Sequence, residues 1–168
     1  MATKTRRKRK PSMNTIKKQL FEEYEANIAM YGRQVIGVFP TRDDTFPLNF
    51  AYTIGNHEKG FPELLVIGPS GEESMGLLNA LSTLMIERGT SFYDGETVQL
   101  IGAGVALKMR AVGQLAKSQF TTQVTAYYQE AAYDVQQVVI PDPNGRYPSE
   151  PGCAPPYRDV PILNDTMH

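Results

Sequence analysis

The sequence predicts an α+β domain, with a small, mainly antiparallel sheet flanked by two or three helices. Amphipathic helical segments alternate with short runs rich in Val, Ile and Leu, and the connections between neighbouring runs are mostly short. Short connections favour antiparallel pairing, because parallel strands need a long crossover. The 168 residues suit one domain that can bury a sizeable core.

The first helix is predicted from Ser12 or Asn14, either of which can cap its start, to Gly32, which favours a left-handed cap. Its apolar residues recur at helical spacing, at Ile16, Leu20, Phe21, Tyr24 and Ile28. A third helix, over residues 118–132, is predicted with Phe120, Val124, Tyr127 and Tyr128 as its buried side, although its Thr and Val residues favour a strand.

The second helix begins with a capping-box pattern, in which Ser70 precedes Glu73 by three residues, and Gly89 ends it. Strands are predicted over residues 34–39, 48–54, 64–67 and 135–140, with a hairpin over 98–101 and 105–109. We expect residues 1–11 to be a basic arm, 12–152 to be the domain, and 153–168 to be an extended tail with exposed Tyr157, Ile162 and Leu163.

The net charge of −1 hides a strong asymmetry along the chain. The first ten residues carry six positive charges and no negative one, which leaves 11 basic and 18 acidic side chains, a formal −7, in the rest. The arm is therefore a candidate for phosphate contacts in nucleic acid, through Arg6, Arg7, Lys8, Arg9 and Lys10. The alternative is a solvated tail, which is favoured because no aromatic residue is available to stack on bases.

Composition also limits the setting and the chemistry. Cys153 is the only cysteine, so no intramolecular disulfide can form, and no apolar run is long enough to span a bilayer. We expect a cytoplasmic protein without a membrane partner. Phosphate-loop and dinucleotide glycine motifs are absent, and one interior histidine cannot form a multi-histidine metal site. No metal is predicted, although Glu63, Asp94, Asp142 or Glu150 could bind Mg²⁺ or Ca²⁺.

The segment 50–63 contains the first group of candidate ligand-binding residues, at the end of a predicted strand: Tyr52, Thr53, His57 and Glu63. His57 lies near Glu58 and Glu63, and such a histidine can act as a general acid or base. The alternative, which is usual for a lone histidine, is an exposed loop without chemistry, in which Glu63 accepts hydrogen bonds from backbone donors.

The segment 141–152 contains the second group, directly after the last predicted strand: Asp142, Arg146 and Glu150. Arg146 can hold a phosphate or a carboxylate through two parallel hydrogen bonds. An ordinary turn stabilised by an Arg–Glu pair is an equally good interpretation. Asp94, in a predicted Asp94-Gly95 turn, is a further candidate ligand residue.

Several motifs, in this order, resemble the bacterial and phage family DUF4262, a domain of unknown function. They are residues 51–55, 61–64 with Val66 and Gly68, 77–81, 94–95, 137–142, 145–148 and 150–152. The resemblance spans about residues 39–152, with departures at Asn56, where the family usually has an apolar residue, and at Ser149, where it often has Trp. The resemblance indicates where the domain begins and ends, but it gives no information on activity or cofactors.

We therefore expect a domain that binds, or acts on, an anionic small molecule or nucleotide in a polar pocket near Arg146. This requires the turn after the last strand to lie beside the end of the Tyr52 strand. The alternative is an interaction protein or accessory factor without catalysis, which binds a protein partner or a second copy of itself. In that case the basic arm contacts nucleic acid or an acidic partner. The sequence leaves open whether the protein is an enzyme.

Overall fold

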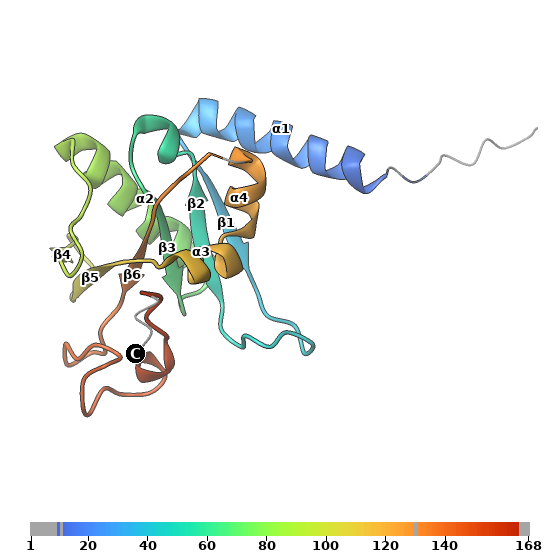
Figure 1. Cartoon of the computed structure of the whole chain (residues 1–168). Coiled ribbons are helices and arrows are strands. Elements are labelled where there is room, and N and C mark those ends of the chain that lie inside the picture. The colour runs from blue at the N-terminus through green and yellow to red at the C-terminus, as the bar shows by residue number, and fades with distance from the viewer. Residues whose placement is uncertain (1–9, 11, 130, 165–168) are drawn as a thin grey trace, which may run out of the picture.

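The computed structural model describes residues 10, 12–129 and 131–164 and has the predicted α+β architecture (Figure 1). Its six strands are β1 (Gln34–Val38), β2 (Phe50–Ile54), β3 (Glu63–Ile67), β4 (Thr97–Gln99), β5 (Ala106–Ala111) and β6 (Val135–Val139). Its α-helices are α1 (Met13–Tyr31), α2 (Gly71–Arg88), α3 (Gln114–Phe120) and α4 (Thr122–Tyr128), and two short 3₁₀ helices cover His57–Lys59 and Tyr157–Asp159.

The strands form one sheet in the order β1-β2-β3-β6-β5-β4. Every neighbouring pair is antiparallel except β3 and β6, which run in parallel with Glu63 opposite Val135 and Val66 opposite Val138. The long connection from β3 to β6, which includes α2, β4, β5, α3 and α4, makes this parallel pairing possible. The predicted mainly antiparallel sheet is therefore confirmed.

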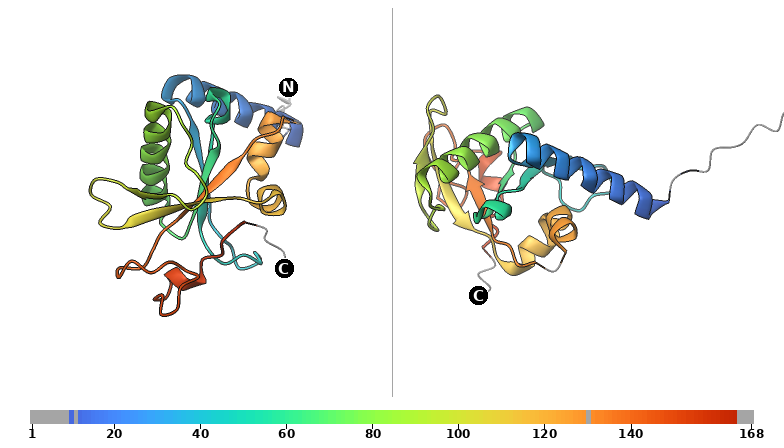
Figure 2. Two further views of the ribbon diagram at one scale, coloured as in Figure 1. Left: turned by 60° about the vertical axis from the view of Figure 1, so that its left-hand side comes forward. Right: turned by 90° about the horizontal axis from the view of Figure 1, so that it is seen from above.

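Helices cover both faces of the sheet, which is seen nearly edge-on in the left view of Figure 2. On one face, α1, α3 and α4 pack on side chains such as Tyr52, Ile54 and Leu65. On the other face, α2 packs on Ala51, Leu64 and neighbouring apolar side chains. Residues that alternate along β2 and β3 thus enter two different cores, as the pleat of a strand requires.

Local sequence explains where α1 and α2 begin and end. The hydroxyl of Ser12 accepts from the N–H of Thr15 at 3.2 Å, and Gly32 ends α1 with a left-handed φ of 92°. At the start of α2, the Ser70 hydroxyl accepts from the N–H of Glu73 at 3.3 Å. The reciprocal bond of a capping box, from the N–H of Ser70 to the Glu73 carboxylate, is not made in the described structure.

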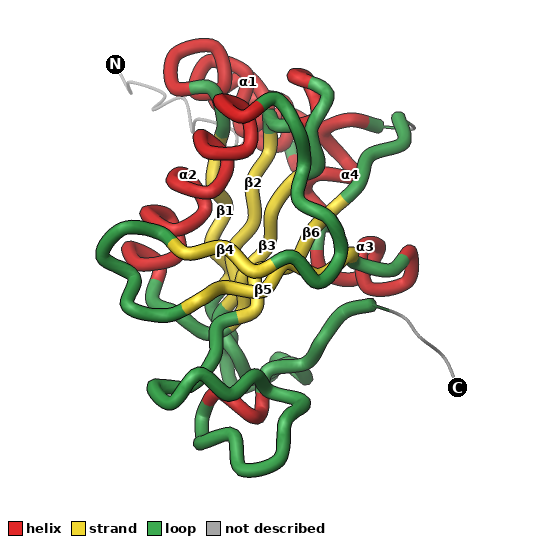
Figure 3. The backbone as a smooth tube through the Cα atoms, turned by 90° about the vertical axis from the view of Figure 1, so that its left-hand side faces the viewer, coloured by secondary structure: helices red, strands yellow, loops and turns green. Residues whose placement is uncertain are grey.

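Two features differ from the sequence-based expectation. The predicted helix 118–132 is two short helices that meet at Thr121, whose φ of −102° and ψ of 48° interrupt helical geometry. The chain after β6 forms loops beyond one end of the sheet (Figure 3), and one of its side chains enters the core. Leu163, expected to be exposed, is buried in the same core as residues of α3 and α4, and its backbone N–H donates to the Gln137 side chain at 2.8 Å.

Candidate functional site

A buried carboxylate organises the loop at the carboxyl end of β2. Glu63, the first residue of β3, is fully buried, and its two oxygens accept hydrogen bonds of 2.8–3.1 Å from five residues. The donors are the hydroxyls of Thr53 and Tyr128 and the backbone N–H groups of Gly55, Asn56 and His57. Such complete pairing offsets the large cost of burying a carboxylate.

The electrostatics of this network are balanced. Burial raises the pKa of Glu63, and the five donors act in the opposite direction by stabilising the ionised form. Backbone N–H groups can only donate, so three of them converging on Glu63 suit the charged carboxylate. Burial and the neighbouring Glu63 raise the pKa of Tyr128, which keeps its proton in place for donation.

The loop held by Glu63 lies unusually close to the chain that joins α1 to β1. Gly55 has a φ of +126°, and a Cβ atom there would lie 3.0 Å from both Arg33 Cα and the Gly32 carbonyl oxygen. Only glycine fits this conformation and this contact. The close approach places Asn56 next to the side chain of Arg33.

Asn56 connects the buried network to Arg33. Its Nδ2 donates to the hydroxyls of Ser82 at 2.9 Å and Thr53 at 3.3 Å, while its Oδ1 accepts from Arg33 Nε at 3.3 Å. A second amide oxygen, Oδ1 of Asn79 on α2, accepts from Arg33 Nη1 at 3.3 Å. Two neutral acceptors from different elements therefore hold the guanidinium in position.

Arg33 faces a pocket of about 370 Å³ at the β1 edge of the sheet. Apart from Arg33, the pocket is lined by Asn27, Tyr31, Gln34, Val35, Met75 and Asn79. Within the described ranges Arg33 forms no ion pair. Partial burial lowers its pKa and the buried Glu63 raises it, but an arginine remains charged in either case. Lys59, whose ammonium donates to the Gly32 carbonyl, adds positive charge at this corner.

The other candidates from segment 50–63 have different surroundings. His57 is half-buried and packs edge-on against the Tyr128 ring, with 4.8 Å between ring centroids. It also borders a pocket of about 500 Å³ that includes Asp134. Its imidazole makes no hydrogen bond within the part of the chain that the structure describes. Tyr52 is a core residue, and burial raises its pKa to about 12. Its role in ligand binding stays a prediction.

The segment 141–152 lies far from these residues, so the expectation that it lies beside the end of the Tyr52 strand is wrong. Since β3 is antiparallel to β2 and parallel to β6, the end of β6 lies beside the start of β2 and not beside its end. Asp142 is buried and accepts from the N–H groups of Asn144, Arg146 and Ala154. The exposed Arg146 guanidinium donates to the Gly152 carbonyl at 3.1 Å.

The remaining predicted site residues are separate from both groups. Asp94 accepts from Arg110 Nε at 3.0 Å and from the N–H of Ala111 at 2.8 Å, so it stabilises the end of β5. Glu150 accepts from the N–H of Tyr147 at 3.1 Å. Of the basic arm, only Lys10 is described, and it is exposed; Arg6, Arg7, Lys8 and Arg9 lie outside the described residues.

Sequence reasoning missed Arg33 and Asn79. Arg33 lies between a helix-ending glycine and a Val- and Ile-rich strand. A long cationic side chain at this position lies next to the edge of the buried sheet. That pattern could have identified Arg33 as a candidate site residue. Asn79 could not have been identified in this way, because polar residues are common on surface helices. Among the described residues, no three His, Cys, Asp or Glu side chains gather into a metal site. No described helix is long and apolar enough to cross a membrane.

Comparison with known proteins gives one match. The model of DUF4262, a domain of unknown function, matches residues 27–154, a range that includes all six strands, the Glu63 network and the Arg33 pocket. No curated protein and no solved structure matches the chain. The match covers more than half of the 168 residues and confirms the resemblance seen in the sequence. The chain therefore belongs to the DUF4262 family.

Proposed function

We propose that this domain binds a small molecule carrying a carboxylate or phosphate group in the Arg33 pocket. The observation that carries the proposal is a half-buried guanidinium that has two neutral acceptors, no carboxylate partner among the described residues, and an open pocket beside it. An anion there would form charge-assisted hydrogen bonds in surroundings less polar than water, where such bonds are strong.

The proposal keeps the anionic ligand expected from the sequence but moves it from Arg146 to Arg33. Arg146 is exposed and extends over the Gly152 carbonyl, so an ion pair there would be weakened by water and salt. Arg33 is half-buried and held by Asn56 and Asn79 before any ligand arrives. A side chain fixed in advance loses less conformational entropy on binding.

The other lining residues favour a small organic anion over a bare ion. Tyr31, Val35 and Met75 offer apolar surface, and Asn27, Gln34 and Asn79 offer amide groups that can orient polar substituents. The volume of about 370 Å³ lies within the usual range for small-molecule sites. We therefore expect a ligand with one anionic group at Arg33 and a compact, partly apolar body.

The test compares Arg33→Gln with Arg146→Gln in a thermal-shift and calorimetric screen of inorganic phosphate, succinate, 3-phenylpropionate and AMP. We expect at least one organic anion to raise the melting temperature of the unaltered protein. Arg33→Gln should remove about 2 kcal/mol of binding free energy, roughly a thirtyfold loss of affinity, because a charged hydrogen-bond donor is lost.

Arg146→Gln is the matched control, because it removes the same charge from an exposed position, and we expect it to leave the affinity unchanged. Loss of binding in Arg146→Gln with retention in Arg33→Gln would return the site to the end of β6. If none of the four anions binds, or if Arg33→Gln binds them as well as the unaltered protein does, the proposal is wrong.

A further inference from the structure

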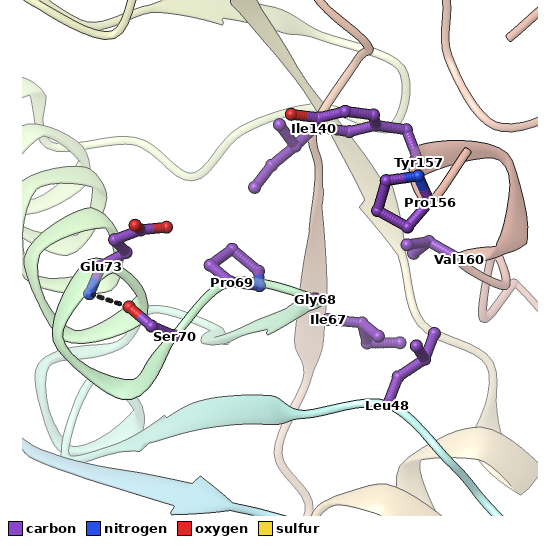
Figure 4. Close-up of a pocket in the computed structure, with 10 residues that line it drawn as sticks. All are labelled: Leu48, Ile67, Gly68, Pro69, Ser70, Glu73, Ile140, Pro156, Tyr157 and Val160. Carbon is purple, nitrogen blue, oxygen red and sulfur yellow. Dashed lines mark hydrogen bonds between the residues drawn. The ribbon is translucent and has the colours of Figure 1, made fainter. Parts of the chain in front are cut away.

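A second cavity lies at the opposite end of the sheet from Arg33, where the parallel strands β3 and β6 end (Figure 4). Its volume is about 340 Å³. Ile67 of β3 and Ile140 after β6 contribute to its floor, Ser70 and Glu73 of the α2 start bound one side, and Pro156, Tyr157 and Val160 bound the other. The carboxyl ends of parallel strands are a common place for ligands.

The wall formed by the C-terminal segment is anchored at both ends. Before the wall, the N–H of Ala154 donates to the Asp142 carboxylate at 2.9 Å. After it, the side chain of Gln137 donates to the Pro161 carbonyl and accepts from the N–H of Leu163, both at 2.8 Å. Because these bonds fix the wall against the sheet, the cavity is formed in advance and a ligand need not order it.

The chemistry of the lining is selective. Among the described residues that line it, most side chains are apolar, and Glu73, which is exposed, is the only charged one. Within the described chain its carboxylate has neither an ion pair nor a hydrogen bond, since the capping-box bond to Ser70 is not made. The start of a helix carries about half a positive charge, which the full negative charge of Glu73 outweighs. The cavity therefore favours a cation over an anion.

We propose that this cavity binds a primary amine with a small apolar body, such as an arylalkyl- or alkylammonium ion. The ammonium group would pair with Glu73, and the apolar part would contact Ile67, Ile140 and Val160. The Tyr157 ring borders the same cavity, and aromatic rings attract cations through their faces. This site is independent of the anion site at Arg33 and would use residues beyond the range matched by the family model.

The experiment uses the full chain and three primary amines, 2-phenylethylamine, cyclohexylmethylamine and butylamine, with 2-phenylethanol and phenylacetate as neutral and anionic analogues. Calorimetry gives affinities, and amide NMR shifts locate the site. We expect saturable binding of 2-phenylethylamine, shifts at Gly68, Ser70 and Tyr157, and at least about threefold weaker binding of both analogues.

Because Glu73 is exposed and water weakens its ion pair, Glu73→Gln should weaken 2-phenylethylamine binding about threefold. Its matched control is Glu72→Gln, which removes a neighbouring charge from the same helical turn without touching the cavity lining. Val160→Trp should fill the cavity and abolish binding, and Arg33→Gln should leave it unchanged. The proposal is overturned if none of the three amines binds saturably, if Glu73→Gln binds them normally, or if the alcohol binds as tightly as the amine.

Discussion

Arg33 and Asn56, 23 positions apart in the chain, are joined by a hydrogen bond of 3.3 Å from Nε to Oδ1. Asn56 is fully buried and Arg33 is partly exposed, so this bond connects the interior to the pocket at the β1 edge. Because Asn56 also donates to Glu63, this bond links the proposed anion site to the Glu63 network.

Removing the second acceptor of Arg33 should weaken anion binding without unfolding the domain. Asn79→Ala deletes the oxygen that accepts from Nη1, and alanine suits the middle of α2. We expect a loss of about 1 kcal/mol in the binding free energy of an organic anion, measured by calorimetry. Asn79→Asp should weaken binding further, because a carboxylate beside Arg33 competes with the ligand. Tighter binding in the Asp variant would contradict this arrangement.

Replacing the buried carboxylate should cost stability as well as binding. In Glu63→Gln, an NH₂ group replaces one of the two carboxylate oxygens, each of which accepts at least two hydrogen bonds. At least two hydrogen-bond donors would then face another donor. We expect the free energy of unfolding in urea to fall by about 3 kcal/mol. Glu58→Gln, an exposed change in the same connection, should stay within about 0.5 kcal/mol. Equal effects in the two variants would show that the network contributes little.

Two glycine-to-alanine changes should have opposite signs. Gly55→Ala places a Cβ atom 3.0 Å from Arg33 Cα at a φ of +126°, so we expect a loss of about 2–3 kcal/mol. Gly76→Ala, inside α2, meets no atom within 4 Å and should add about 0.5–1 kcal/mol, because alanine favours helix. Chemical denaturation measures both, and stabilisation by Gly55→Ala would disprove the close contact.

The Asp142 loop should make the protein sensitive to acid. Hydrogen bonds from the N–H of Ala154, then from that of Arg146, hold the pKa of Asp142 below its ordinary value of 3.8. The folded chain thus binds fewer protons than the unfolded chain. The resulting stability is present above about pH 4 and is lost as the pH falls through the folded-state pKa.

Asp142→Asn removes the titrating carboxyl group. It also places an NH₂ group against at least one of the backbone N–H donors that now donate to Asp142. We expect it to lower the urea midpoint at pH 7 and to reduce the further decline between pH 7 and pH 3. Asp43→Asn, at an exposed position, should behave like the unaltered protein. A decline of the same size in Asp142→Asn would mean that other carboxylates cause the acid sensitivity.

The sequence was sufficient for the local structure and insufficient for the long-range pairing. The glycine caps and the apolar periodicity located α1 and α2 within one or two residues. The parallel pairing of β3 with β6 depends on contacts between distant segments, and no local pattern encodes it. That pairing decides which loops are neighbours, so the predicted site residues fell into separate groups. Thr53 and Glu63 were correctly expected to be close, since β2 and β3 are joined by a short loop.

Leu163 fills space in the core although it lies nine positions after the end of the matched family range. A chain cut at residue 154 would leave a hole beneath α3 and would strip Gln137 of two partners. We therefore expect the cooperative folding unit to extend beyond the matched range. Any macromolecule that bound the side chain of Leu163 would have to remove it from the core, so such binding would be coupled to partial unfolding.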